Sequence, residues 1–334
     1  MNEAAPAPSV CLLFRKRDRF FSIERIFHQL EPFLAETLVL RKWTAAHSSF
    51  RYWIRNVRDA RKIRADVFHV TGDIHYITIG LPRRRTILTI HDCVFLYTEK
   101  GWRRWLLKQL FLDIPVKRSR LVTTISQRTK EDIVCHTGCQ PEKVIVIPNP
   151  VDNAIAYRPA IFNQDKPVLL FIGSTPNKNL ERVIASLEHI PCLLDIVGEI
   201  SPGQKALLQQ YHITFRQQAG LSDQEIVDKY TSSDLVVFPS TFEGFGLPVI
   251  EAQKAGRPVV TSDLSPMKEV AGGAACLVDP LSKESIREGI LKVIKDKAYR
   301  ESLIEAGLSN AARFSPAHIA GQYLDCYKKI LTDP

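Results

Sequence analysis

One pattern recurs along nearly the whole chain: a short apolar run, a connection, and then an amphipathic stretch. Such alternation is typical of strand–helix units that build a parallel sheet. A proline-rich segment interrupts the pattern once, running from Ile147-Pro-Asn-Pro-Val-Asp152 through Tyr157-Arg-Pro159 to Lys166-Pro167. Because proline stops helices and removes a backbone donor, we interpret this segment as a linker between two domains.

The pattern predicts six strands on each side of the linker. Before it, the strand candidates are 9–14, 37–40, 66–70, 86–90, 120–124 and 143–147, with helical patterns at 22–35, 48–63, 101–118 and 126–136. After it, the strand candidates are Val168–Ile172, Leu193–Val197, Ile213–Phe215, Leu235–Phe238, Val259–Val260 and Ala275–Val278. The last segments, 282–296, 297–313 and 317–331, are helical in pattern.

These elements place the chain in the α/β class, as two Rossmann-like, doubly wound parallel-sheet domains facing each other across a cleft. Its 334 residues suffice for two cores of about 150 residues each. We expect an N-terminal domain over 1–155, a C-terminal domain over 156–315, and a final helix over 316–334 that crosses back to the N-terminal domain. In such sheets ligands bind beyond the carboxyl ends of the strands.

Composition indicates a globular protein, with 45% hydrophobic and 24% charged residues. No apolar run approaches the roughly 18 residues of a membrane helix, and the N-terminus lacks the basic start of a secretory signal. The seven cysteines are scattered without a CxxC pair. We therefore expect free thiols, no zinc site and a cytoplasmic location.

The net charge of +9 is unevenly distributed. Residues 1–150 hold 26 basic and 14 acidic side chains, and the remainder holds 19 and 22. The basic clusters are Arg15-Lys16-Arg17, Arg51 to Arg64, Arg83-Arg84-Arg85 and Trp102-Arg103-Arg104-Trp105. A helix near 101–110 suits peripheral contact with the anionic inner face of the cell membrane; the alternative is a solvated basic face without a specific partner. Nucleic acid is not an expected partner, because no nucleic-acid-binding motif accompanies the charge.

Three loops of the second half follow predicted strands. The first, Gly173-Ser174-Thr-Pro-Asn-Lys178-Asn179-Leu180, leads into a helix whose free N–H groups would attract an anion, with Lys178 adding a positive charge. Taken alone, it also fits an ordinary strand-to-helix turn. The third, Gln218-Ala-Gly220-Leu221-Ser222, ends a strand and opens a capped helix.

The second loop is the most distinctive, Phe238-Pro-Ser-Thr-Phe-Glu243-Gly-Phe-Gly-Leu-Pro248-Val-Ile-Glu251. Pro248 suits the first turn of a helix, so we expect a helix to start near Leu247. Glu243 then lies in the loop and Glu251 about one turn into the helix. Carboxylates so placed accept hydrogen bonds from sugar or ribose hydroxyls.

The stretch Glu243-Gly-Phe-Gly-Leu-Pro-Val-Ile-Glu251 resembles the two-glutamate motif of the retaining family 4 glycosyltransferases, which have the GT-B fold. Gly173 to Leu180 resembles their phosphate-binding loop, and His91-Asp92 resembles a substrate-side His-Asp pair. Thr124-Ile-Ser126 and Val146-Ile-Pro-Asn149-Pro-Val-Asp152 are similar to the stretches that lead into the family's linker. The similarity is dense from about 86 to 280 and thin before that.

The resemblance implies three catalytic residues: Lys178 against the leaving diphosphate, Glu243 on the transferred sugar, and His91 approaching that sugar from the other domain. Glu251 would hold the nucleotide ribose, and Gly220-Leu221 would line the base pocket. The implied donor-binding residues are Gly173, Ser174, Asn179, Gly220, Leu221, Gly244, Phe245, Gly246, Leu247 and Glu251.

The chain departs from the family in three places. Pro176 and Asn177 stand where an arginine often accompanies the lysine, and Pro150 stands where the linker usually has glycine. The glycine-rich loop after the first strand is replaced by Phe14-Arg-Lys-Arg-Asp18, which suits a phosphate-bearing acceptor such as a polyprenyl-diphosphate-linked sugar. The acceptor-side candidates are Arg15, Arg17, Asp92 and Ser126.

The expected function is transfer of a hexose from a nucleotide-diphosphate sugar to a glycan or lipid-linked acceptor, with retention of anomeric configuration, in bacterial surface polysaccharide or glycolipid assembly. No Asp-x-Asp pair is present, so we expect no metal, no cofactor and activity that survives EDTA. The Lys-Asn-Leu form of the phosphate loop resembles that of mannosyltransferase-like members, which implies GDP-mannose rather than a UDP-hexose as donor. Open alternatives are a nucleotide-sugar epimerase and a catalytically inactive, partner-binding relative; a dehydrogenase is disfavoured because no GxGxxG follows either opening strand.

Overall fold

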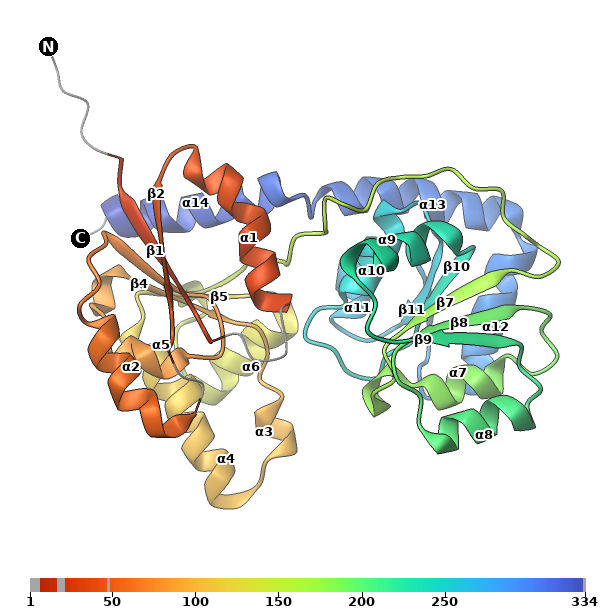
Figure 1. The fold of residues 1–334 in the computed structure, drawn as a ribbon, viewed down its shortest axis with the longest axis horizontal. Coiled ribbons are helices and arrows are strands. Elements are labelled where there is room, and N and C mark those ends of the chain that lie inside the picture. The colour runs from red at the N-terminus through yellow and green to blue at the C-terminus, as the bar shows by residue number, and fades with distance from the viewer. Residues whose placement is uncertain (1–6, 17–21, 47–48, 333–334) are drawn as a thin grey trace, which may run out of the picture. The chain divides into compact units, whose positions relative to one another are not determined.

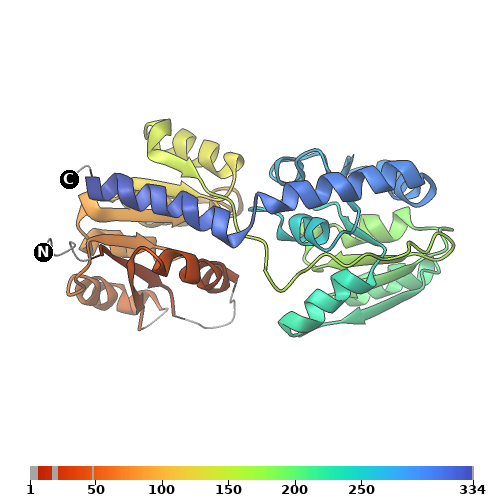
Figure 2. The same ribbon diagram turned by 90° about the horizontal axis from the view of Figure 1, so that it is seen from above.

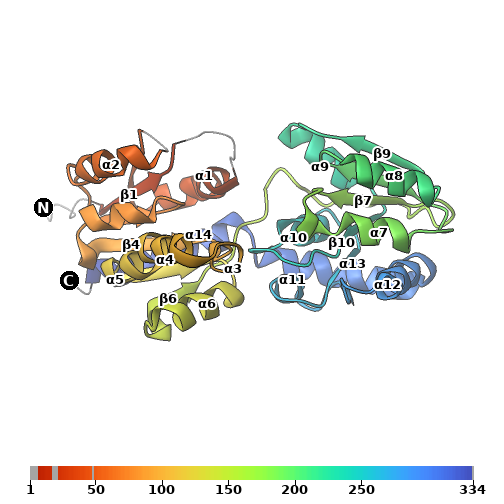
Figure 3. The same cartoon turned by 90° about the horizontal axis from the view of Figure 1, so that it is seen from below.

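A computed structural model describes residues 7–16, 22–46 and 49–332. The chain folds into two compact units, one formed by residues 1–150 with 316–334 and the other by residues 151–315 (Figure 1). The division lies at 150/151 rather than at the 155/156 expected from the sequence. Each unit is a parallel sheet with helices on both faces (Figures 2 and 3).

The N-terminal unit contains a six-stranded parallel sheet in the order β2-β1-β3-β4-β5-β6. Its strands are β1 (Ser9–Phe14), β2 (Val39–Thr44), β3 (Val67–Val70), β4 (Thr86–Ile90), β5 (Leu121–Thr124) and β6 (Val144–Val146). Its helices are α1 (Ser22–Ala35), α2 (Trp53–Ala60), α3 (Phe95–Thr98), α4 (Gly101–Lys108), α5 (Ile114–Arg118), α6 (Gln127–Thr137) and α14 (Pro316–Thr332).

The strand period of two explains why both faces of this sheet are covered. Val10 and Leu12 of β1 pack in one apolar cluster with α1 and α14. Cys11 and Leu13, which point the other way, pack in a second cluster with residues of η2 (the 3-10 helix His75–Gly80) and α5. The buried strands therefore read as continuous apolar runs, as expected for a parallel sheet.

The C-terminal unit repeats the architecture with the order β12-β11-β10-β7-β8-β9. Its strands are β7 (Val168–Ile172), β8 (Leu193–Val197), β9 (Phe215–Gln218), β10 (Leu235–Phe238), β11 (Val259–Ser262) and β12 (Cys276–Val278). Its helices are α7 (Leu180–Ser186), α8 (Pro202–Gln210), α9 (Asp223–Ser232), α10 (Leu247–Lys254), α11 (Met267–Ala271), α12 (Lys283–Lys295) and α13 (Lys297–Ala312).

Some elements differ from the sequence-based expectation. The second strand is shifted toward the C-terminus, because its first residues still close the turn after α1, where Leu38 N donates to Leu34 O. The third strand of the C-terminal unit begins at Phe215 rather than Ile213. The helix expected over 101–118 is divided by a π-helical turn at Gln109–Asp113, just before Pro115. A proline ring removes a helical hydrogen bond, and π-turns are one way a helix absorbs this.

Candidate active site

The strand order of the C-terminal sheet brings two of the expected loops together. β7 lies between β10 and β8, so the chain leaves β7 and β10 in adjacent positions. This is the topological switch point, where doubly wound sheets bind ligands. The loop after β7 carries Lys178 and the loop after β10 carries Glu243.

Lys178 and Glu243 meet at this point. Lys178 Nζ donates to Glu243 Oε1 over 2.7 Å, and the two side chains are 20% and 14% exposed. Lys178 Nζ also lies 4.8 Å from the centre of the Phe238 ring, within cation–π range. The lysine is thus held by a carboxylate and an aromatic face at the edge of the sheet, accessible to solvent but partly buried.

Backbone conformations in the first loop place Lys178. Gly173 has a φ of +88°, and a Cβ there would lie 3.0 Å from two carbons of the Lys178 side chain. Asn179, at φ 71°, opens α7, and its buried amide donates to Pro239 O at 3.0 Å and Pro280 O at 2.6 Å. Glycine therefore lets the lysine stem cross the backbone, and Asn179 ties the two loops together.

Two further side chains position Glu243. Ser240 Oγ lies 2.6 Å from Glu243 Oε1, and Asn177 Nδ2 donates to the same oxygen at 3.3 Å. Asn177 Nδ2 also lies 2.9 Å from Phe242 O. From the sequence, Asn177 was only a departure from the family and Ser240 only part of the second loop, and no role was predicted for either. Their signal was weak, because a lone serine or asparagine beside a strand end is common in any loop.

Helix α10 begins at Leu247, where the sequence predicted a helix start. Gly246 precedes it at φ 103°, and Pro248 stands in its first turn. Glu251 lies further along the helix and accepts a hydrogen bond from Tyr230 at 2.5 Å. Tyr230 is fully buried, and this burial together with the adjacent carboxylate raises the pKa of its hydroxyl well above the usual range.

The remaining candidates of this unit range from buried to exposed. Phe245 is buried in edge contact with Phe314, and Gly244 is half-buried. Ser174 Oγ donates to the backbone oxygen of Glu199, in the loop after β8. Gly220, at φ 69°, is exposed, and Leu221 helps to line a cavity of about 250 Å³.

In the N-terminal unit the switch point lies between β1 and β3. Arg15, just after β1, pairs with Glu24 at 3.1 Å and with Asp73 at 2.7 Å, so its guanidinium is already engaged by two carboxylates. This weakens the expectation that it faces an acceptor. Arg17 lies outside the described residues.

Three other candidates of this unit follow β4 and β5. His91 Nε2 lies 2.8 Å from Thr71 O, and since a carbonyl only accepts, Nε2 carries a proton and Nδ1 is the acceptor in the neutral ring. Asp92 accepts from Val94 N in a local turn. Ser126 is buried, and its side chain caps α6 by accepting a hydrogen bond from Thr129 N.

Two features are absent from residues 7–16, 22–46 and 49–332. No helix among them is long and apolar enough to cross a bilayer. No three His, Cys, Asp or Glu side chains in the same part of the chain gather as a metal site would.

Comparison with known proteins identifies relatives of both units. Residues 156–309 match the model of glycosyl transferases group 1, and residues 10–154 match that of glycosyltransferase family 4. The O-antigen chain mannosyltransferase B of Escherichia coli is 36% identical over 74% of this chain and 72% of that enzyme. The serotype-specific mannosyltransferase WbdA of Escherichia coli is 23% identical over 76% of this chain, which spans only 35% of its length.

Among solved structures, HepE of Anabaena in complex with UDP and glucose superposes with a TM-score of 0.75 at 16% sequence identity. The match covers 96% of this chain and 99% of that one. It therefore extends over both units and shows the common fold.

Proposed function

Because this chain belongs to the group 1 glycosyl transferases of family 4 and is a glycosyltransferase, we propose that it is a retaining mannosyltransferase that uses GDP-mannose. Its product would be a bacterial surface polysaccharide or glycolipid. The observation that carries the proposal is the Lys178–Glu243 pair at the switch point of the C-terminal sheet. Two mannosyltransferases among the relatives support the choice of sugar.

In the proposed mechanism Lys178 and the amino end of α10 stabilise the leaving diphosphate. A lysine ammonium and free helix N–H groups favour developing negative charge without a metal ion. Glu251 would accept hydrogen bonds from the ribose, and Glu243 from hydroxyls of the transferred sugar. The reaction would proceed through an oxocarbenium-like transition state, in which the departing phosphate accepts the acceptor's proton.

A transfer assay tests this proposal. Labelled GDP-mannose is incubated with the enzyme, a polyprenyl-diphosphate-linked oligosaccharide and EDTA, and the product is analysed by NMR. We expect an α-mannoside and no loss of rate with EDTA. Conversion of GDP-mannose without acceptor would indicate an epimerase, and tight nucleotide binding without turnover an inactive relative; either outcome contradicts the proposal. A parallel reaction with UDP-glucose tests the choice of donor.

We also propose that the enzyme works in the cytoplasm, at the inner face of the cell membrane, where lipid-linked acceptors are found. Helix α4 supports this, because Trp102 and Trp105 are 72% and 63% exposed beside Arg103 and Arg104. Tryptophan and arginine together favour an anionic bilayer interface.

Co-sedimentation with anionic vesicles tests the membrane proposal. Replacing Trp102 and Trp105 by alanine is expected to weaken binding at least fivefold. Ile161→Ala removes a side chain that is 98% exposed in the other unit and serves as the control. Equal effects of the two changes would contradict a specific role for α4.

A further inference from the structure

A hollow of about 360 Å³ lies at the amino-terminal edge of the N-terminal sheet. It is lined by the first half of β3 and by the segment that precedes β4. Arg15 and His91 follow the carboxyl ends of strands in the same sheet, so the hollow lies at the opposite edge from them. It is therefore separate from the edge where doubly wound sheets bind substrates.

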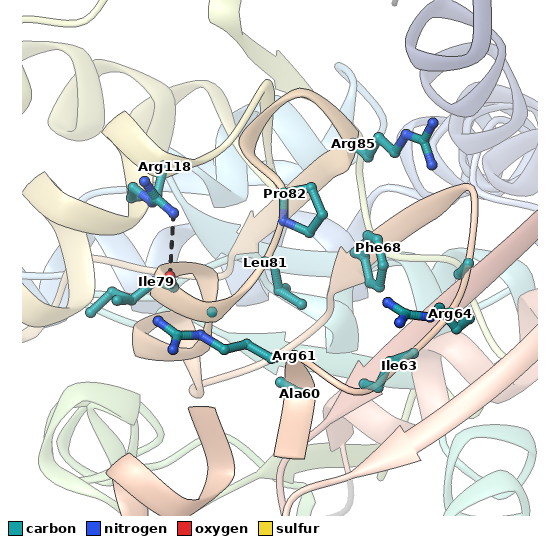
Figure 4. A pocket seen from close by; sticks show the side chains of 12 residues that line it. Ala60, Arg61, Ile63, Arg64, Phe68, Ile79, Leu81, Pro82, Arg85 and Arg118 are labelled. Carbon is teal, nitrogen blue, oxygen red and sulfur yellow. Dashed lines mark hydrogen bonds between the residues drawn. The ribbon is translucent and has the colours of Figure 1, made fainter. Parts of the chain in front are cut away.

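Four exposed arginines line this hollow, which we call the arginine pocket: Arg61, Arg64, Arg85 and Arg118 (Figure 4). Arg61 and Arg64 follow α2, Arg85 directly precedes β4, and Arg118 ends α5. Figure 4 shows Arg61, Arg64 and Arg118 around the buried Leu81. Three separate segments thus bring cationic groups to one apolar floor.

Backbone contacts hold the pocket in shape. Arg118 Nη2 donates to Ile79 O at 3.2 Å. Gly80 lies against α2 so closely that an added Cβ would be 2.7 Å from Val57 O and 3.3 Å from Arg61 Cγ. Any other residue at Gly80 would push α2 and Arg61 away, so the glycine allows the close approach that forms this wall.

The positive charge of the pocket is not balanced by its own lining, because none of the described residues that line it carries a carboxylate. The two acidic side chains nearest in sequence have other partners. Asp66 accepts from Ser9 N at 2.8 Å and Ser9 Oγ at 2.7 Å, and Asp59 pairs with Lys62 at 2.8 Å. The Ser9 hydrogen bonds are the main cause that lowers the pKa of Asp66, and the charges of Arg85 and Arg41 lower it less. The guanidinium groups around the hollow repel one another, and a bound anion would offset this repulsion.

We propose that the arginine pocket binds a compact ligand carrying two or more phosphate groups. Guanidinium groups bind phosphate oxygens through paired N–H donors, which a set of arginines can do from several sides at once. The apolar floor of Phe68 and Leu81 would face the uncharged part of such a ligand. The phosphates belong either to a lipid headgroup or to a soluble polyphosphate ester.

The binding test uses inorganic tripolyphosphate in calorimetry with the full chain. Two double variants remove charge from the pocket, Arg61→Gln with Arg118→Gln and Arg64→Gln with Arg85→Gln. The variant with Arg64→Gln and Arg85→Gln keeps the hydrogen bond from Arg118 to Ile79 O. It therefore still tests phosphate binding if the variant with Arg61→Gln and Arg118→Gln folds poorly. The control, Arg103→Gln with Arg104→Gln, removes the same charge from α4. Every protein in this comparison also carries Lys178→Gln, which removes the lysine that would bind the same probe in the C-terminal unit.

Both pocket variants are expected to raise the tripolyphosphate dissociation constant at least tenfold, and the control less than twofold. An equal loss in the control would show diffuse charge attraction, and an unchanged constant in both pocket variants would show no site; either result overturns the proposal.

Vesicles of phosphatidylcholine with and without cardiolipin, whose headgroup carries two phosphates, distinguish the sources. If the pocket variants also lose cardiolipin-dependent vesicle binding, and the α4 control retains more of this binding than they do, the ligand is a lipid headgroup. If they bind these vesicles like the wild type, the ligand is soluble.

Discussion

Lys178 and Glu243 are each other's partner in this structure, 2.7 Å apart. A diphosphate at the same edge would compete with Glu243 for the lysine, since a doubly charged phosphate attracts an ammonium more strongly than one carboxylate does. We infer that donor binding exchanges these partners and frees Glu243 to accept hydrogen bonds from the sugar. The ion pair would thus be a resting arrangement of the two side chains that we propose to be catalytic.

Glu243→Gln is the prediction that follows at this scale. The amide keeps an acceptor for Ser240 but loses the charge that Lys178 contacts. We expect kcat to fall about 10²–10³-fold, the range for removal of one group that stabilises a transition state. The free energy of unfolding, measured by urea denaturation, should change by no more than about 1–2 kcal/mol.

Glu301→Gln is the matched control, because Glu301 is 63% exposed on α13 and 3.7 Å from Lys297. It should leave both kcat and stability unchanged. A Glu243→Gln enzyme with wild-type turnover would refute a catalytic role for this carboxylate.

Single residues show where sequence reasoning stops. That Lys178 and Glu243 lie together could be predicted, because both stand in recognisable loops that follow predicted strands. Ser240 could not, because its hydrogen bond to Glu243 depends on how the loop turns after β10. Asp195 is a stronger case: it is fully buried within the apolar run of β8, and only the fold brings Lys229 to 2.7 Å and Arg216 to 2.6 Å from it.

At the scale of elements, a buried polar network joins α14 to the N-terminal sheet. His69 of β3 is fully buried, with Nδ1 2.8 Å from the Tyr327 hydroxyl and Nε2 2.7 Å from Thr89 Oγ1. Removing one partner leaves a buried polar atom unsatisfied, which costs about 1–3 kcal/mol. Tyr327→Phe should therefore lower the free energy of unfolding of the N-terminal unit by that amount, measured by urea denaturation.

The control for that change is Tyr211→Phe, which alters a half-buried tyrosine of the C-terminal unit. It should leave the N-terminal unit unaffected. If Tyr327→Phe were as stable as the wild type, α14 would be held by apolar packing alone.

The same network predicts a pH dependence. Burial lowers the pKa of His69 to about 3, from the usual histidine value of 6.5. The neutral ring therefore contributes stability that is present above pH 6.5 and is lost as the pH falls toward 3. Over that window this one group should reduce the free energy of unfolding by about 1.4 kcal/mol per pH unit.

Urea unfolding between pH 4 and 7 checks this dependence. A His69→Gln variant should show a flatter curve than the wild type, whereas His136→Gln, at the end of α6, should not. Parallel curves for the wild type and His69→Gln would contradict the prediction.

Elements were predicted where the pattern was strong. β1, β4, β7, β8 and β10 begin and end where the apolar runs do, because buried parallel strands are apolar on both faces. The helix over 101–118 was predicted as continuous, and its π-turn was missed because hydrophobic periodicity does not reveal a one-residue change of hydrogen bonding. The short helices α3 and α11 carry too few residues to show any period.

At the scale of the whole molecule, the chain forms two compact units, and its last helix returns to the first of them. The final helix belongs to the N-terminal unit although 165 residues of the other unit precede it, 151–315. A nucleotide that binds the C-terminal unit stabilises it by about 2.7 kcal/mol at 100 times its dissociation constant.

Hydrogen exchange with GDP should therefore show protection concentrated in the C-terminal unit. We expect slower exchange at the loops after β7 and β10 and in α10, and little change in β1 to β6 away from their carboxyl ends. Uniform protection of both sheets would contradict binding centred on the C-terminal unit.

We propose above all that Lys178 holds the diphosphate of the donor. Calorimetry of GDP and GMP with the wild type and with Lys178→Gln tests it most directly, because GMP lacks the second phosphate. We predict that the substitution raises the dissociation constant of GDP at least tenfold, which corresponds to about 1.4 kcal/mol. The dissociation constant of GMP should change less than twofold. An equal loss for both nucleotides, or no loss for either, would contradict the account.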